Sequence, residues 1–386
     1  MKTDNVFSVI DDLAAEYVAV WEDVCNLESP SSDKQGVDAV CAYFIKLSEK
    51  FGWKVEVYLQ ERFGDPVCIT MNPEVKKAPI ALSGHVDTVH PVGSFGFPAA
   101  RRDGDRLYGP GAVDCKGGIV AGFLAMHALH EVGYKDRPVM MLLQTNEEIG
   151  SGIDNKAPIQ YICEKAKNAV AFLNLEGHEV CFASKACVKR KGIAGFQFTV
   201  TGVSVHAAKC AKEGANALAE AAYKIIELEK IKQDGGLTFS CNMISAGTSR
   251  NTVPDRCEFQ VDVRYATAEE FDEAKRLVEE IANKVHVEGC RCGATLTNMR
   301  MAMEPNEKNM ALLERANAAF EENGLSILEA GMCNGGSDAA DISDYGIPCL
   351  DSLGVGGERI HTTEEFGLIR SLVDSAKRLA AIISSL

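Results

Sequence analysis

Apolar and polar residues follow one rhythm over the first half of the chain. Two amphipathic segments, 4–27 and 34–51, predict helices, and another helix is expected to begin near Gly117. Short, nearly continuous apolar runs predict strands that are buried on both faces. These runs are residues 53–60, 67–71, 79–86 and 138–144. Buried strands that alternate with helices indicate α/β layers, with a sheet covered on both sides.

From about residue 188 the rhythm becomes that of half-exposed strands. Residues 195–200 alternate between apolar and polar, and the order that follows is helix, strand, strand, helix, strand. These later elements are expected at residues 214–231, 237–244, 256–264, 267–285 and 294–301. The whole order is typical of ferredoxin-like α+β modules.

The α/β rhythm returns after this module, with a helix at 308–323, a glycine-rich stretch at 331–337 and a strand at 348–350. We therefore predict an α/β/α domain with a mixed sheet, formed by residues 1–187 and 301–386. A smaller inserted domain, residues 188–300, interrupts it.

The composition disfavours several classes of partner. The chain has 386 residues and a net charge of −15, and both nucleic acid and anionic membranes repel such a protein. The N-terminus lacks the apolar core of a signal peptide, and we expect no membrane-spanning run, so the cytoplasm is the expected compartment. The 14 cysteines lack C-x-x-C spacing and are expected to be buried free thiols.

Residues that can carry chemistry lie where the predicted strands end. His85 and Asp87 close one strand, and positions two apart in a strand face the same side. A carboxylate beside a histidine is typical of an imidazole that is oriented toward a metal ion. Asp114 precedes two glycines that open a helix. The alternative interpretation of Asp114 is the N-cap of that helix.

Glu147 and Glu148 directly follow a predicted buried strand, where adjacent carboxylates are costly to crowd together without a cation. One is expected to bind a metal and the other to take a proton from a water molecule that the metal activates. The alternative for this pair is a solvated acidic turn. Glu176 ends another strand, with His178 as a less favoured ligand, and His361 lies in a glycine-rich loop.

Jointly, these positions offer two histidines and several carboxylates on separate loops. A pair of cations needs such a set: one histidine and one carboxylate each, and one carboxylate that bridges them. Nitrogen and oxygen ligands favour zinc, with cobalt or manganese as alternatives. The sequence therefore predicts a hydrolase with two zinc ions.

The motifs resemble those of one family. The matching segments occur in the family's order, at residues 84–89, 111–118, 146–151, 175–177 and 360–365. By them the chain resembles the di-zinc metallopeptidases that include glutamate carboxypeptidase, aminoacylase, acetylornithine deacetylase and succinyl-diaminopimelate desuccinylase. The resemblance covers nearly the whole chain. It implies a catalytic domain that is interrupted by a ferredoxin-like lid and dimerisation domain.

This resemblance implies a role for each residue. The implied metal ligands are His85 and Glu176 for one zinc, Glu148 and His361 for the other, and Asp114 as the bridge. Asp87 is expected to orient the His85 ring, and Glu147 to act as general base. The peptide bond between Asp114 and Cys115 is expected to be cis, as it is in the family.

The inserted domain adds expected substrate contacts. By resemblance, His206 polarises the carbonyl of the scissile bond and reaches the site of the other subunit in a homodimer. Asn251 and Arg264 are expected to bind the substrate's oxygen and its free α-carboxylate, since arginine grips a carboxylate with two parallel hydrogen bonds. Gly336 is expected to lie beside the substrate. Without the resemblance, His206 would be read as a surface strand residue and Arg264 as a salt-bridge partner.

The predicted activity is hydrolysis of a peptide or N-acyl amide bond next to a free carboxylate, as in a carboxypeptidase or an aminoacyl-deacylase. The expected substrate is a small peptide or an N-acyl amino acid. Within the family, Glu rather than Asp at position 176 favours this activity over that of a di- or tripeptide aminopeptidase. A catalytically silent scaffold is disfavoured by the filled ligand positions, and a thiol redox protein is suggested only by the cysteine count.

Overall fold

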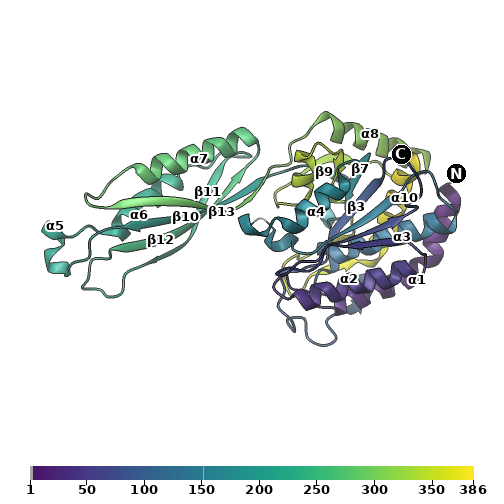
Figure 1. Cartoon of the computed structure of the whole chain (residues 1–386), viewed down its shortest axis with the longest axis horizontal. Coiled ribbons are helices and arrows are strands. Elements are labelled where there is room, and N and C mark those ends of the chain that lie inside the picture. The colour runs from purple at the N-terminus through teal and green to yellow at the C-terminus, as the bar shows by residue number, and fades with distance from the viewer. Residues whose placement is uncertain (1–2, 151) are drawn as a thin grey trace.

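The computed structural model describes residues 3–150 and 152–386. The chain forms a larger lobe, which holds both ends of the described chain, and a smaller, elongated lobe that projects from it (Figure 1). Four strands and the helices between them make up the smaller lobe. This arrangement agrees with the predicted α/β fold with an inserted α+β module.

The larger lobe is built on a six-stranded mixed sheet, as predicted. Its strands, in spatial order, are β1 (Lys54–Val57), β2 (Val67–Met71), β6 (Val139–Gln144), β3 (Ile80–His85), β7 (Ala171–Asn174) and β15 (Cys349–Leu350). The strands from β6 to β15 are parallel, whereas β1 and β2 pair antiparallel. Every residue of β2, β3, β6 and β7 is buried, because helices cover both faces.

Alternate residues of these strands belong to different hydrophobic clusters. One cluster packs the sheet against α1 (Thr3–Asn26), α2 (Lys34–Glu49), α3 (Gly117–Glu131), α8 (Glu307–Glu322) and α10 (Ile369–Ser385). The other packs the opposite face against α4 (Ala157–Ala166) and α9 (Ala339–Asp344). The α/β/α layers follow from this division.

One apolar segment corrects the expectation that no run is long enough to cross a membrane. Residues 112–131 reach that length with a mean hydropathy of 1.3, but 89% of the segment is buried inside the structure. The segment consists of the turn before α3 and α3 itself, and this helix contacts α1, α10 and the sheet. A helix that is surrounded by protein in this way is apolar all round because of its place in the core.

The smaller lobe contains an antiparallel sheet in the order β11-β12-β10-β13. Its elements are β10 (Gly192–Thr201), α6 (Ala217–Leu228), β11 (Thr238–Ala246), β12 (Arg256–Tyr265), α7 (Ala268–Asn283) and β13 (Arg291–Arg300). Alternate residues of β10 and β12 are buried together with apolar residues of α6 and α7. The predicted strand and helix order is therefore confirmed, and it forms a ferredoxin-like sheet.

The chain enters and leaves the smaller lobe through adjacent strands. β9 (Lys185–Arg190) pairs in parallel with β14 (Glu329–Cys333), and β10 begins two residues after β9 ends. On the return, β13 ends at Arg300, and Met303 pairs with Arg190. The domain limits at residues 188 and 300 stay predictions, and the change of sheet lies close to them.

Several short strands were not predicted. They form a second sheet of the larger lobe from β4 (Arg101–Asp103), β5 (Arg106–Tyr108), β17 (Phe366–Leu368), β16 (Gly356–Glu358) and β8 (His178–Glu179). Residues 366–368 pair as β17, and α10 begins directly after them at Ile369. The helix expected at 214–231 begins at Ala217, because the Asn216 side chain accepts hydrogen bonds from the backbone nitrogens of the next turn.

Candidate metal centre and active site

The predicted site residues lie at the carboxyl ends of the parallel strands. His85 is the last residue of β3, Glu147 and Glu148 lie in the turn after β6, and Glu176 lies two residues after β7. Asp114 lies in the turn Ala112–Lys116, before α3. In α/β sheets this edge is where ligands bind, because loops from neighbouring strands converge there.

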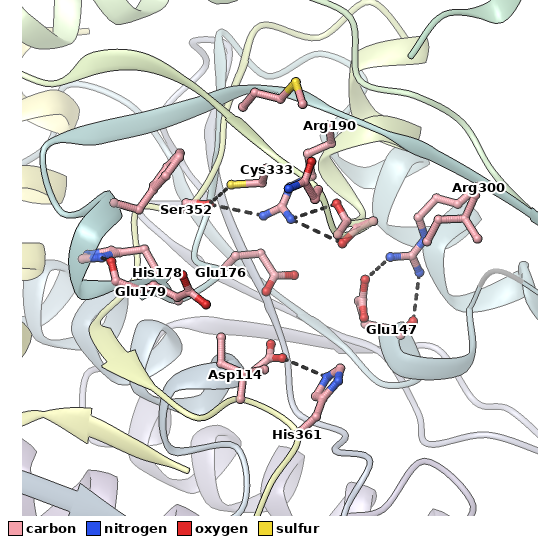
Figure 2. A pocket seen from close by; sticks show the side chains of 18 of the residues that line it. Asp114, Glu147, Glu176, His178, Glu179, Arg190, Arg300, Cys333, Ser352 and His361 are labelled. Atoms are coloured by element: carbon pink, nitrogen blue, oxygen red, sulfur yellow. Dashed lines mark hydrogen bonds and ion pairs between the residues drawn. The ribbon is translucent and has the colours of Figure 1, made fainter. Parts of the chain in front are cut away.

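Asp114 lies between two groups of potential ligands. One of its oxygens, Oδ1, is 3.0 Å from His85 Nε2, and the same nitrogen is 3.8 Å from Glu176 Oε2. The other oxygen, Oδ2, is 3.2 Å from His361 Nε2, which lies 3.3 Å from Glu148 Oε2. Each carboxylate oxygen of Asp114 thus faces a different histidine, and each histidine has a different glutamate beside it. Figure 2 shows the contact between Asp114 and His361.

The backbone near Asp114 departs from regular structure. The peptide bond between Asp114 and Cys115 is cis, as expected. Neither residue has helical backbone angles, and Lys116 is the residue that precedes α3. Asp114 is therefore not the N-cap of this helix. His361 has a positive φ of 63°, a conformation that is uncommon for residues other than glycine and that often marks functional sites.

Burial and charge shift the pKa values of these groups strongly. Burial raises the pKa of Glu148 to about 8 and that of Glu176 to about 7. Hydrogen bonds to Asp114 and Glu148 raise the pKa of His361 to about 10. Burial alone would lower the pKa of His85, but its anionic neighbours raise it well above 6.5. The site thus holds several buried carboxylates close together, and their negative charges need a compensating positive charge.

The donor set fits a pair of metal ions. His85, Asp114 and Glu148 each bring a nitrogen or oxygen ligand atom within 4.8 Å of the others, and His85 and Glu176 do the same. The Cys115 sulfur also lies near His85 and Glu176, but it faces the main chain and accepts a hydrogen bond from the His85 backbone nitrogen at 3.0 Å. The ligands that remain are imidazole and carboxylate, which suit a divalent metal ion such as zinc.

Asp87 links its own segment, which follows His85, to the loop that holds Ser31 and to the turn that holds Glu147 and Glu148. It is fully buried, and its carboxylate accepts hydrogen bonds from the backbone nitrogens of Glu147, at 2.9 Å, and Glu148, at 3.2 Å, and from the Ser31 hydroxyl, at 2.6 Å. The Nδ1 atom of His85 lies 2.9 Å from the Asp87 backbone oxygen and 3.5 Å from its carboxylate. The closest contact to the ring is therefore the backbone carbonyl, while the carboxylate holds the loop that carries both glutamates.

The site opens into a cavity of about 580 Å³. Figure 2 shows Glu147, Glu176, Asp114 and His361 around it. Gly336 and Arg264 also line this cavity, and Arg264 forms a two-point contact with Asp262 at 2.7 and 3.1 Å. The structure therefore gathers most of the predicted site residues around one cavity.

His206 and Asn251 do not line this cavity within the single chain. Both are exposed residues of the smaller lobe. They lie close together, because the backbone of His206 forms a β-bridge with Thr252 and the Ala207 backbone nitrogen donates to the Asn251 carbonyl. The predicted reach of His206 into the site of a second subunit and the predicted substrate contact of Asn251 stay predictions.

Sequence reasoning missed two buried arginines at the cavity. Arg300 contacts the carboxylate of Glu147 and donates to the Glu147 backbone oxygen at 2.9 Å (Figure 2). Arg190 Nε lies 2.5 Å from Asp351 Oδ2, with both side chains buried. No sequence pattern marked these pairs, because their partners are more than 150 positions away.

Comparisons with known proteins agree with this geometry. Residues 81–385 match the model of Peptidase family M20/M25/M40. Carboxypeptidase G2 from Pseudomonas sp. (strain RS-16) is 30% identical over 370 residues, which cover 94% of this chain and 87% of the relative. Succinyl-diaminopimelate desuccinylase from Psychromonas ingrahamii is 24% identical over 362 residues, which cover 90% and 92%.

Solved structures share the fold. Aminopeptidase PepT from Bacillus cereus superposes with a TM-score of 0.77 at 22% identity, covering 96% of this chain and 98% of that one. The YXEP protein of Bacillus subtilis, described as a dinuclear metal binding peptidase, gives 0.72 at 16% identity and covers 97% and 100%. The family match and the 30% identical relative establish the relationship that the motifs indicated. This chain belongs to Peptidase family M20/M25/M40, and it is a metal-dependent hydrolase.

Proposed function

We propose that the enzyme hydrolyses a peptide or N-acyl amide bond next to a free carboxylate, in a small peptide or an N-acyl amino acid. The observation that carries this proposal is the position of Asp114, with one oxygen toward each of two histidines at the floor of a cavity. The relatives named above, a carboxypeptidase and a desuccinylase, support the substrate class.

Two zinc ions are the proposed cofactors, with cobalt or manganese as alternatives. His85 and Glu176 would hold one ion and Glu148 and His361 the other, with Asp114 between them. When bound, the ions would activate a water molecule and polarise the carbonyl of the scissile bond.

The side chains of the enzyme supply the proton transfers and the substrate contacts. Glu147 takes a proton from the attacking water molecule and delivers it to the leaving nitrogen, as a general base and then a general acid. Asp87 fixes the backbone of Glu147 through the hydrogen bond to its nitrogen. Arg264 binds the free carboxylate of the substrate, and the backbone at Gly336 lies beside the substrate.

A homodimer completes the proposed site. His206 and Asn251 would reach the cavity of a second copy and bind the scissile carbonyl and a substrate oxygen. The smaller lobe exposes large apolar side chains that suit such an interface, at 41–61% exposure: Leu218, Tyr223 and Ile226 on α6, and Met243 and Ile244 on β11. The cysteines whose side chains the structure describes are free thiols, which supports the cytoplasm as the proposed compartment.

The test is a panel of dipeptides and N-acyl amino acids, assayed with the zinc-loaded enzyme and its Glu147→Gln variant. We expect activity on substrates with a free carboxylate and loss of that activity when the carboxylate is amidated. The variant should keep its metal but lose several orders of magnitude in turnover, because the general base is gone.

Two outcomes would contradict the proposal. Activity that survives amidation of the carboxylate but is lost when the amine is blocked would favour an aminopeptidase, the activity named for PepT. Full turnover in a metal-loaded Glu147→Gln variant would remove Glu147 from the reaction. Cobalt- and manganese-loaded enzyme, run on the same panel, shows which metal supports turnover.

A further inference from the structure

Glu147 is held by a side chain that comes from the smaller lobe. Arg300 is the last residue of β13, and its side chain is only 5% exposed. One end of the guanidinium contacts Glu147 Oε1, and Nη2 donates to the Glu147 backbone oxygen at 2.9 Å. The arginine thus contacts both the carboxylate and the main chain of one residue, which fixes the direction of the side chain.

Arg300 is the only positively charged partner of Glu147 among the residues that the structure describes. Glu147 itself is 8% exposed, and its charge contributes to the raised pKa values of Glu148 and Glu176, which burial mainly causes. A carboxylate that is buried among others needs a paired cation. Arg300 supplies that charge.

The surrounding backbone is shaped around Arg300. A Cβ atom at Gly150 would lie 3.2 Å from Arg300 Nη2, and one at Gly336 would lie 3.0 Å from Arg300 Cδ. Gly336 therefore makes room for this arginine in addition to lining the cavity. On the far side, Asp338 Oδ1 lies 3.7 Å from Arg300 Nη2 and has no hydrogen-bond partner in the described structure.

We propose that Arg300 is a positioning residue for the general base. Its contact with Oε1 leaves Oε2 of Glu147 for the proton, and the Glu147 backbone is held at its nitrogen by Asp87 and at its oxygen by Arg300. This is the logic of a third group that orients a catalytic base. The inference rests on the proposed role of Glu147, and it links that role to the strand by which the smaller lobe rejoins the larger one.

The test compares two arginines that both reach the cavity from the smaller lobe. For Arg300→Gln we expect kcat to fall about 100-fold with little change in KM, because the substrate still binds but the base is misplaced. For Arg264→Gln, the matched control, we expect KM to rise more than kcat falls. Arg300→Lys keeps the charge but not the two-point contact, and should retain a kcat between those of Arg300→Gln and the unaltered enzyme.

Two readouts other than activity accompany these kinetics. Metal content per chain should stay close to that of the unaltered enzyme. The thermal unfolding temperature should fall, because Arg300→Gln leaves the buried Glu147 carboxylate without its paired cation. A crystal structure of the Arg300→Gln variant should show the Glu147 carboxylate displaced while the backbone of its loop stays in place. An unmoved Glu147 would overturn the inference.

The kinetic outcomes also distinguish a failure of the positioning role of Arg300 from a failure of the proposed function. A rise in KM at unchanged kcat would assign Arg300 to substrate binding and overturn its positioning role. If Glu147→Gln is inactive and Arg300→Gln is fully active, this inference fails while the proposed function stands. If Glu147→Gln is active, the proposed function fails, whatever Arg300 does.

Discussion

At the scale of single residues, the sequence was most informative where side chains with metal-binding chemistry follow predicted strands. His85, Asp114, Glu148, Glu176 and His361 are 276 positions apart from first to last, yet their ligand atoms meet at one edge of the sheet. Strand ends made this convergence predictable, because parallel neighbours end at the same edge.

Pairs that depend on packing could not be predicted in the same way. Arg300 in the smaller lobe meets Glu147 in the larger one only because of how β13 returns to the sheet. The Asp87 carboxylate lies 3.5 Å from Nδ1 of the His85 ring that it was expected to orient, and it also accepts hydrogen bonds from the backbone of the glutamate loop, which were not predicted. The two-residue spacing of His85 and Asp87 predicted which way this side chain faces, but not its hydrogen bonds to the backbone of Glu147 and Glu148.

Gly118 offers a residue-scale prediction. A Cβ atom at this position would lie 1.9 Å from the Leu175 backbone oxygen, and Leu175 directly precedes Glu176. We expect Gly118→Ala to lower the free energy of unfolding by about 1–3 kcal/mol, since only backbone movement can relieve the overlap. Urea denaturation of the metal-free protein would measure this change, and zinc titration should show weaker binding.

Gly293→Ala is the matched control for this experiment. Gly293 lies in β13, and a Cβ atom there would meet nothing within 4 Å. We expect this variant to unfold like the unaltered protein. Equal stability of the Gly118 and Gly293 variants would refute the steric account of how α3 packs against the end of β7.

At the scale of secondary-structure elements, long periodic segments were predicted well and short ones were missed. The predicted helices and buried strands of the main sheet agree with the structure to within a few residues. The strands of the second sheet have two or three residues each, too few for an apolar period to be visible.

The glycine-rich stretch after residue 330 shows that a high glycine content does not exclude a strand. No strand was predicted there, but residues 329–333 pair with β9 as β14. Gly331 is needed in that strand because a Cβ atom would lie 2.4 Å from the Phe182 ring. Glycine here marks a close approach within a strand, and this contact is invisible until the fold is known.

At the scale of the whole molecule, the two-part architecture was predictable and the assembly was not. The change from continuous apolar runs to alternating strands indicated an inserted module, and the ferredoxin-like sheet bears this out. Nothing in the pattern of one chain fixes how two copies meet. The proposed dimer depends on His206 and Asn251, which are exposed and do not line the cavity of their own chain.

The dimer leads to a prediction about mixed active sites. We expect light scattering to give twice the mass of the 41.7 kDa chain. Mixing inactive His206→Ala and Glu147→Gln variants should restore part of the activity, because one mixed site then holds an intact base and an intact His206. A monomer with full activity would contradict the role of His206.

The proposed function requires five side chains to hold two metal ions on either side of Asp114. Anomalous diffraction at the zinc absorption edge, from crystals of the zinc-loaded enzyme, tests it most directly. We expect two peaks. One should lie within about 2.0–2.2 Å of ligand atoms of His85, Glu176 and one Asp114 oxygen, and the other equally close to Glu148, His361 and the second Asp114 oxygen. A single peak, or peaks bound elsewhere on the chain, would contradict it.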